Sequence, residues 1–66
     1  MRLLLNGDER DFAEVSNVAD LVAALGLDAR KVAVERNLEI VPRSTYGHTA
    51  LADGDRIEIV TFIGGG

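Results

Sequence analysis

The chain has 66 residues and no cysteine, and its seven basic and eleven acidic residues give a net charge of −4 at pH 7. This length allows one domain with a modest core, and the lack of cysteine excludes disulfides, thiolate metal sites and thiol nucleophiles. The negative charge argues against nucleic-acid binding, which depends on neutralising phosphates with Lys and Arg. No apolar run is long enough to span a bilayer, and Met1 leads directly into a strand-like segment. We therefore expect a cytoplasmic protein without a signal peptide.

The first part of the chain is predicted to form a β-hairpin. Residues 1–5 alternate between two faces, as in a strand. Residues 6–8, with the sequence Asn-Gly-Asp, tolerate positive φ and favour a tight turn. Residues 9–15 would then return antiparallel to the first strand, with Phe12 as the main contribution of this segment to the core.

A short amphipathic helix is predicted over residues 18–25. Asn17 is a typical N-cap, and Asp20 stands where a capping box places its acidic residue. Gly26 can adopt the left-handed conformation that ends many helices. Because a helix this short cannot bury its apolar stripe alone, it must lie across a sheet. The stripe consists of Val18, Leu21, Val22 and Leu25.

Two short strands follow the helix. Residues 32–35 read as one strand, residues 37–39 as a turn, and residues 40–41 as the next strand. Pro42 cannot donate a hydrogen bond to a sheet, so this strand should lie at an edge or end there.

The last third of the chain leads from an irregular segment into a final strand. Residues 43–50 have no clear periodicity, and we expect Tyr46 and Leu51 to anchor them to the core. Residues 53–55 predict a turn and residues 56–62 a strand. A crossover that contains a helix separates the two hairpins, so the last strand should lie beside the first and parallel to it. The sequence thus predicts an α+β fold of the β-grasp, ubiquitin-like type, with four to five strands in a mixed sheet and one helix across one face.

Alternation along the last strand predicts an interaction surface. If Ile57 and Ile59 face the helix, then Val60 and Phe62 must point to the opposite side of the sheet. Leu4 on the first strand should likewise point away from the helix, because it alternates with Leu3 and Leu5. An exposed apolar patch on a small protein commonly marks a binding surface. We therefore expect Val60, Phe62 and Leu4 to contact a partner.

The side chains offer little for catalysis. Glu35 and Glu39 flank a turn and look solvated, and the only histidine, His48, has no nucleophile to activate. His48 also lacks a cysteine or second histidine with which to hold zinc, so we expect neither a bound metal nor another bound cofactor. The carboxylate of Gly66 is the remaining candidate for a reactive group.

The three glycines at the C-terminus suit a carboxyl group that must enter a narrow slot. Without a Cβ, Gly64, Gly65 and Gly66 can pass where other residues cannot. We expect a domain over residues 1–63 and a flexible tail over residues 64–66. A carboxylate becomes an acyl donor when it attacks the α-phosphate of ATP and displaces pyrophosphate, which needs the charged pocket of a larger partner. An amine acceptor would then give a ubiquitin-like conjugate, and a sulfur donor would give a thiocarboxylate.

The whole chain resembles the ThiS family of sulfur carriers in thiamine biosynthesis. The specific part is the sequence Asp-Gly-Asp-Arg-Ile-Glu-Ile-Val shortly before the terminal glycines. The segments that carry the resemblance are residues 3–7, 32–37, 40–43 and 51–60 and the glycine end; three glycines rather than two close the chain.

This resemblance implies the β-grasp fold and a cycle of partner enzymes. A ThiF-like adenylyltransferase would use ATP to adenylate Gly66, and sulfur from cysteine, supplied through a cysteine desulfurase or another sulfur donor, would give the thiocarboxylate. A ThiG-like thiazole synthase would take up that sulfur. Gly64 and Gly65 would be the flexible approach, and Val60 and Phe62 match the surface where family members meet their partners.

Three alternatives stay open on the sequence alone. A carrier for molybdopterin synthesis would share the fold, the tail and the adenylation chemistry. A protein modifier would form amide bonds to lysines, and a plain β-grasp interaction module would make no use of its glycines.

Overall fold

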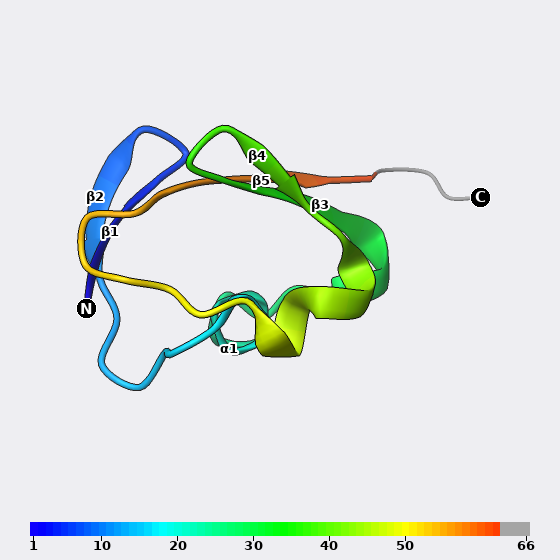
Figure 1. The fold of residues 1–66 in the computed structure, drawn as a ribbon, viewed down its shortest axis with the longest axis horizontal. Coiled ribbons are helices and arrows are strands. Elements are labelled where there is room, and N and C mark those ends of the chain that lie inside the picture. The colour runs from blue at the N-terminus through cyan, green and yellow to red at the C-terminus, as the bar shows by residue number, and fades with distance from the viewer. Residues whose placement is uncertain (63–66) are drawn as a thin grey trace.

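The structure, a computed structural model, describes residues 1–62. Five strands form one mixed sheet in the order β2-β1-β5-β3-β4, and the helix α1 lies across one face of it (Figure 1). The elements are β1 (Arg2–Leu5), β2 (Asp8–Asp11), α1 (Val18–Ala24), the 3₁₀ helix η1 (Ala29–Lys31), β3 (Val32–Arg36), β4 (Glu39–Val41), the 3₁₀ helix η2 (Arg43–His48) and β5 (Arg56–Thr61).

The central strand of the sheet is β5, the last one in the chain. It lies parallel to β1, with Leu4 opposite Arg56, and antiparallel to β3, with Val34 opposite Ile59. Both expected hairpins are present, and the parallel pairing of the first and last strands is confirmed. This arrangement is the β-grasp fold.

The core lies between the inner face of the sheet and α1. Alternation places Ile57 and Ile59 of β5 on this inner face, where both are buried as predicted. Burying a side chain of this size contributes roughly 1.5–3 kcal/mol, so a small set of residues holds the fold together. The buried apolar residues are Leu3, Leu5, Phe12, Val15, Val18, Leu21, Val22, Val32, Val34, Val41, Tyr46, Leu51, Ile57 and Ile59.

Local hydrogen bonds define both ends of α1. The Asn17 side chain accepts a 2.8 Å hydrogen bond from the Asp20 amide, which confirms the N-cap. At the other end, Gly26 has φ of 72° and its N–H donates to the Ala23 carbonyl, while the Leu27 N–H donates to the Val22 carbonyl. This pair of bonds is the Schellman motif, for which a left-handed glycine is best suited.

Two predicted segments differ from the structure. The second strand ends at Asp11 instead of residue 15, and Phe12 and Val15 turn inward to the core. The segment expected to be irregular contains η2, whose first turn is closed by a hydrogen bond from Thr45 to the Pro42 carbonyl. Tyr46 and Leu51 are both buried, as expected. The Tyr46 hydroxyl donates a 3.3 Å hydrogen bond to the Val32 carbonyl and so fixes η2 against β3, a partner that the local sequence does not predict.

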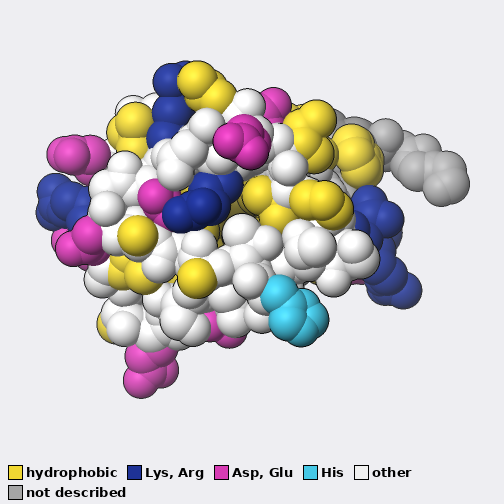
Figure 2. All heavy atoms as spheres, in the orientation of Figure 1, with side chains coloured by type: hydrophobic (Ala, Val, Ile, Leu, Met, Phe, Trp, Pro, Cys, Tyr) yellow, Lys and Arg dark blue, Asp and Glu magenta, His cyan; other side chains and the backbone are white. Residues whose placement is uncertain are grey.

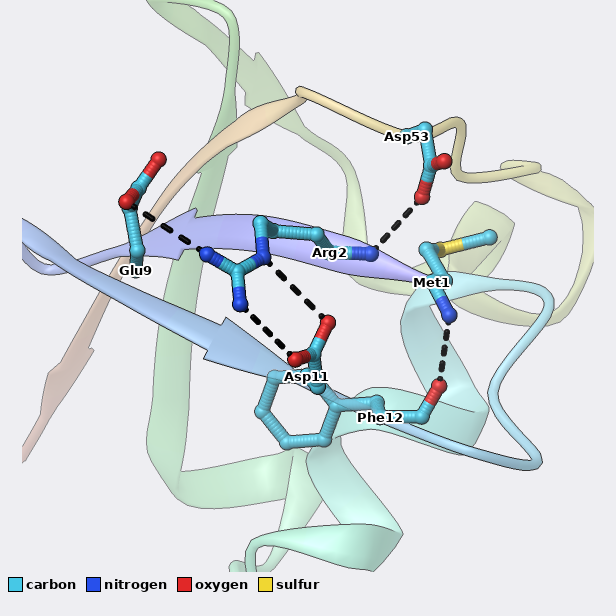
Figure 3. A network of polar contacts seen from close by, with 6 residues as sticks. All are labelled: Met1, Arg2, Glu9, Asp11, Phe12 and Asp53. Atoms are coloured by element: carbon cyan, nitrogen blue, oxygen red, sulfur yellow. Dashed lines mark hydrogen bonds and ion pairs between the residues drawn. The ribbon is translucent and has the colours of Figure 1, made fainter.

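The end of the sheet formed by β1 and β2 is strongly polar. Figure 3 shows the Arg2 guanidinium in contact with Asp11 at 2.9 Å and with Glu9 at 3.5 Å, and the Arg2 amide donating to Asp53. These charges are largely exposed and contribute little to stability. Together with the charged sequence of β2, they discourage edge-to-edge pairing with another sheet.

Candidate functional site at the end of β5

The outer face of β5, opposite α1, carries apolar side chains near the C-terminal end of the strand. Val60 is 60% exposed and Phe62 is 54% exposed, whereas Ile59, the residue before Val60, is buried. The Phe62 N–H donates a 2.8 Å hydrogen bond to the Lys31 carbonyl, so the backbone is still fixed to the residue before β3 at this point. The exposure expected from alternation is therefore present at both residues.

Asn6, the residue after β1, holds the middle of β5 on the edge opposite β3. Its side-chain oxygen accepts a 2.8 Å hydrogen bond from the Ile59 amide, and its side-chain nitrogen donates to the Ile59 carbonyl at 3.2 Å. Asn6 has φ of 49°, a conformation that asparagine tolerates better than most residues. The side chain thus continues the pairing of β1 with β5 after the backbone of β1 has turned away.

The start of β5 is fixed by Asp55, which is 7% exposed. Its carboxylate accepts hydrogen bonds from Arg36 Nε at 2.8 Å, from Asn37 Nδ2 at 3.0 Å and from the Ala52 amide at 2.9 Å. Burial by itself would raise the pKa of Asp55, but these hydrogen bonds outweigh it and hold the pKa below its usual value. The contacts of Asp55 at the start of β5 and of Asn6 at its middle thus fix the direction of the strand.

Leu4, the third residue predicted for the interface, lies apart from the other two. It is half-buried on β1 and pairs with Arg56, four residues before Val60 on β5. That separation is about 13 Å along the strand. The structure therefore brings Val60 and Phe62 together and leaves Leu4 near the polar end of the sheet.

Two further apolar residues, absent from the predicted interface, are strongly exposed. Leu38, in the turn between β3 and β4, is 69% exposed, and Ile40 on β4 is 78% exposed. Ile40 alternates with the buried Val41 just as Val60 alternates with Ile59. This alternation in the sequence could have identified Ile40 as an exposed residue.

Glu35, Glu39 and His48, which the sequence analysis judged unsuited to catalysis, do not form a site. Glu39 and His48 are exposed, and Glu35 lies opposite Glu58 in the sheet. Among residues 1–62, no group of three or more potential metal ligands comes together. In the same part of the chain, every helix is too short or too polar to cross a membrane. The predicted tail, Gly64, Gly65 and Gly66, lies outside the described residues, as does the predicted boundary at residue 63.

Comparison with known proteins decides the family. The model of the ThiS family matches residues 3–66. This chain belongs to the ThiS family. It is 43% identical to the sulfur carrier protein ThiS of Bacillus subtilis, over 97% of this chain and 98% of that protein. The crystal structure of the thiamine biosynthesis protein ThiS from Geobacter metallireducens has the same fold, with a TM-score of 0.83 and 36% identity over the full length of both chains.

Other relatives of this ThiS family member are much longer. The chain is 59% identical over its whole length to a thiazole synthase of Paramagnetospirillum magneticum and 44% identical to one of Magnetococcus marinus. It spans only 20% of the length of each of these two proteins. A ThiS-like unit and a thiazole synthase thus occur within one polypeptide in these relatives.

Proposed function

We propose that this chain is a sulfur carrier of thiamine biosynthesis and that the Gly66 carboxylate is the group that carries the sulfur. The observation that supports this function most directly is membership of the ThiS family over residues 3–66, with a relative of matching length named as a sulfur carrier. The geometry agrees, because β5 is fixed at its start and middle, and the exposed Val60 and Phe62 come shortly before the glycines in the sequence.

The proposed chemistry converts the carboxylate of Gly66 into a thiocarboxylate, by activation first and sulfur transfer second. The Gly66 carboxylate attacks the α-phosphate of ATP, pyrophosphate leaves, and an acyl adenylate forms. A hydrosulfide ion that attacks the acyl carbon displaces AMP and gives the thiocarboxylate directly. If the terminal sulfur of a desulfurase persulfide attacks instead, AMP leaves and an acyl disulfide forms, and two thiol groups then reduce its S–S bond, becoming a disulfide themselves and releasing the thiocarboxylate. Gly64 and Gly65 would allow this group to enter a slot too narrow for side chains. This route requires that Gly66 end in a free carboxylate.

Partner enzymes would perform every catalytic step. Adenylation needs the positioning and charge neutralisation of a large ATP site, which a larger partner would supply, so we assign no catalytic activity to the chain itself. We propose a ThiF-like adenylyltransferase, a cysteine desulfurase or other sulfur donor, and a ThiG-like thiazole synthase as partners. The two long relatives named as thiazole synthases support the last of these. Because activation consumes ATP, we place it in the cytoplasm.

Intact-mass spectrometry tests this function. The chain is incubated with the adenylyltransferase of the same organism, ATP and a sulfur donor. We expect a species heavier than the unmodified chain by the difference between sulfur and oxygen. Omission of ATP and deletion of Gly66 should each abolish it. An unchanged mass in the complete mixture would contradict the carrier function, and the starting mass shows whether the chain ends at Gly66.

A substitution in the tail tests the narrow slot. Gly65→Ala should slow formation of the heavier species, because one methyl group would clash where two glycines pass. Gly47→Ala is the matched change, at an exposed glycine where an added Cβ meets nothing within 4 Å, and should leave the rate unchanged. A normal rate with Gly65→Ala would contradict the slot.

A further inference from the structure

The chain contains only one side chain that is a primary amine. Six of its seven basic residues are arginine, and Lys31 is the single lysine. The guanidinium group of arginine stays protonated in proteins and does not act as a nucleophile, whereas an unprotonated lysine does. Lys31 and the α-amine of Met1 are therefore the two amines with which this chain can attack an acyl group.

These two amines lie at different ends of the sheet. The Met1 ammonium donates a 2.9 Å hydrogen bond to the Phe12 carbonyl, beside β1 and β2 (Figure 3). Lys31 is exposed, and its carbonyl accepts a 2.8 Å hydrogen bond from the Phe62 N–H, at the end of the described chain. Figure 2 shows Lys and Arg side chains at the right-hand end of the molecule, where β5 ends in Figure 1. The single lysine thus lies beside the last residue before the C-terminal segment.

The length of this segment allows the Gly66 carboxyl group to reach Lys31. Four residues follow Phe62, and fully extended they span at most about 14 Å. The Lys31 amine stands on a flexible four-carbon side chain. Groups joined by a short linker meet at an effective concentration on the order of millimolar. At micromolar concentrations of the carrier, Lys31 therefore meets the carboxyl group of its own chain far more often than that of a second copy.

We propose that Lys31 is an acceptor site that captures the activated carboxyl group of Gly66 of the same chain when no sulfur donor takes it. The proposal rests on the function proposed above, because it needs the acyl adenylate. The unprotonated Lys31 amine attacks the acyl carbon, the bond from this carbon to the phosphate oxygen breaks, and AMP leaves. The attacking nitrogen loses one proton to water. The product is an amide bond between Lys31 Nζ and the Gly66 carbonyl carbon.

Capture by Lys31 competes with sulfur transfer. Both reactions consume the same acyl adenylate, and an amide is far less reactive toward nucleophiles than an adenylate. A chain closed in this way has no terminal carboxylate left and carries no sulfur. The amount of closed chain therefore rises when the supply of sulfur falls.

Omission of the sulfur donor tests the acceptor site. The chain is incubated with the adenylyltransferase of the same organism and ATP, and ATP–pyrophosphate exchange measures adenylate formation. We expect a species lighter than the unmodified chain by one water molecule. Trypsin cuts after arginine, so this species should yield residues 31–36 joined through Lys31 to residues 57–66. Addition of the sulfur donor should reduce the lighter species.

Two variants separate the amine of Lys31 from its charge. Lys31→Arg keeps the positive charge but removes the nucleophile, so it should abolish the lighter species and leave the rate of exchange unchanged. Arg10→Lys, introduced together with Lys31→Arg, restores one lysine at a different place. Arg10 lies opposite Leu3 on the far side of the sheet, about 20 Å from Phe62 along the strand direction. This double variant should not form the lighter species.

The possible results distinguish this inference from the carrier function. Exchange without a lighter species in the wild type would overturn the acceptor site, as would a lighter species that survives Lys31→Arg. A covalent dimer in place of the closed monomer would overturn capture within one chain. None of these results contradicts the carrier function, which formation of the thiocarboxylate tests by itself. Absence of exchange would contradict both.

Discussion

The guanidinium of Arg36 donates a 2.8 Å hydrogen bond to the carboxylate of Asp55, and this contact joins the end of β3 to the residue before β5. Asn37, in the turn after β3, donates to the same carboxylate and accepts a hydrogen bond from the Arg56 amide. No buried side-chain polar atom among the described residues lacks a partner. The central strand thus starts from a fully bonded polar cluster.

Asp55 should make the stability of the protein depend on pH below about 4. The pKa of Asp55 is lowered in the folded state, so its stabilising effect is present above the unfolded pKa and is lost as the pH falls through the folded pKa. Asp55→Asn should cost roughly 2 kcal/mol at pH 7, because it removes a charged acceptor of three hydrogen bonds. Urea unfolding at pH 7, 5 and 3 measures both effects.

The variant should also reduce the acid sensitivity. Some sensitivity will remain, because hydrogen bonds also lower the pKa of Asp20 and bring that of Asp28 to about 2. Asp8→Asn, at an exposed position without an ion pair, is the control and should behave like the wild type. An Asp55→Asn protein that loses as much stability between pH 5 and 3 as the wild type would contradict this role.

Asn6 should protect the Ile59 amide. Replacing Asn6 by Gly keeps a residue that accepts positive φ but removes both side-chain hydrogen bonds to Ile59, so we expect a loss of about 1–2 kcal/mol. Asn6→Ala should cost more, because alanine also strains the backbone. Hydrogen exchange should show faster exchange at Ile59 in both variants. Unchanged protection there would mean that the side-chain pairing contributes nothing.

Local patterns were sufficient to predict the elements that depend on neighbours in sequence. The helical stripe that begins at Val18, the N-cap at Asn17 and the alternation of Ile57 and Ile59 all gave the correct structure. Each rests on a period of 3.6 or 2 residues or on a cap bond within one turn. The faces of β5 followed directly, and so did the exposure of Val60.

Relations between distant segments were harder to predict. The position of Leu4 depends on the register of β1 against β5, and alternation gives the face of a residue but not the row it occupies. The pairing of Glu35 with Glu58 is a register relation of the same kind. The shape of η2 depends on Tyr46 reaching β3, which the sequence around Tyr46 does not encode.

Leu38 should be replaceable by glycine at no cost to folding. Asn37 and Leu38 both have positive φ, as in a type I′ turn, where the second position strongly favours glycine. Leu38→Gly removes this strain, and we expect the free energy of unfolding to stay unchanged or to rise by about 1 kcal/mol at most. If Leu38 contributes to docking, the same variant should bind the thiazole synthase more weakly. A clear loss of stability in urea unfolding would contradict this interpretation of the turn.

Phe62 should be important for binding and nearly dispensable for folding. Its side chain is 54% exposed on the outer face, so Phe62→Asp should cost less than about 1 kcal/mol of stability. On this face, the new carboxylate should weaken binding to the adenylyltransferase and the thiazole synthase, which calorimetry can measure. Leu4→Asp is the comparison: this residue is half-buried and pairs with Arg56, six residues or about 20 Å before Phe62 along the strand direction. It should cost more stability and affect binding less. The reverse order of the two variants would place the interface at the polar end of the sheet.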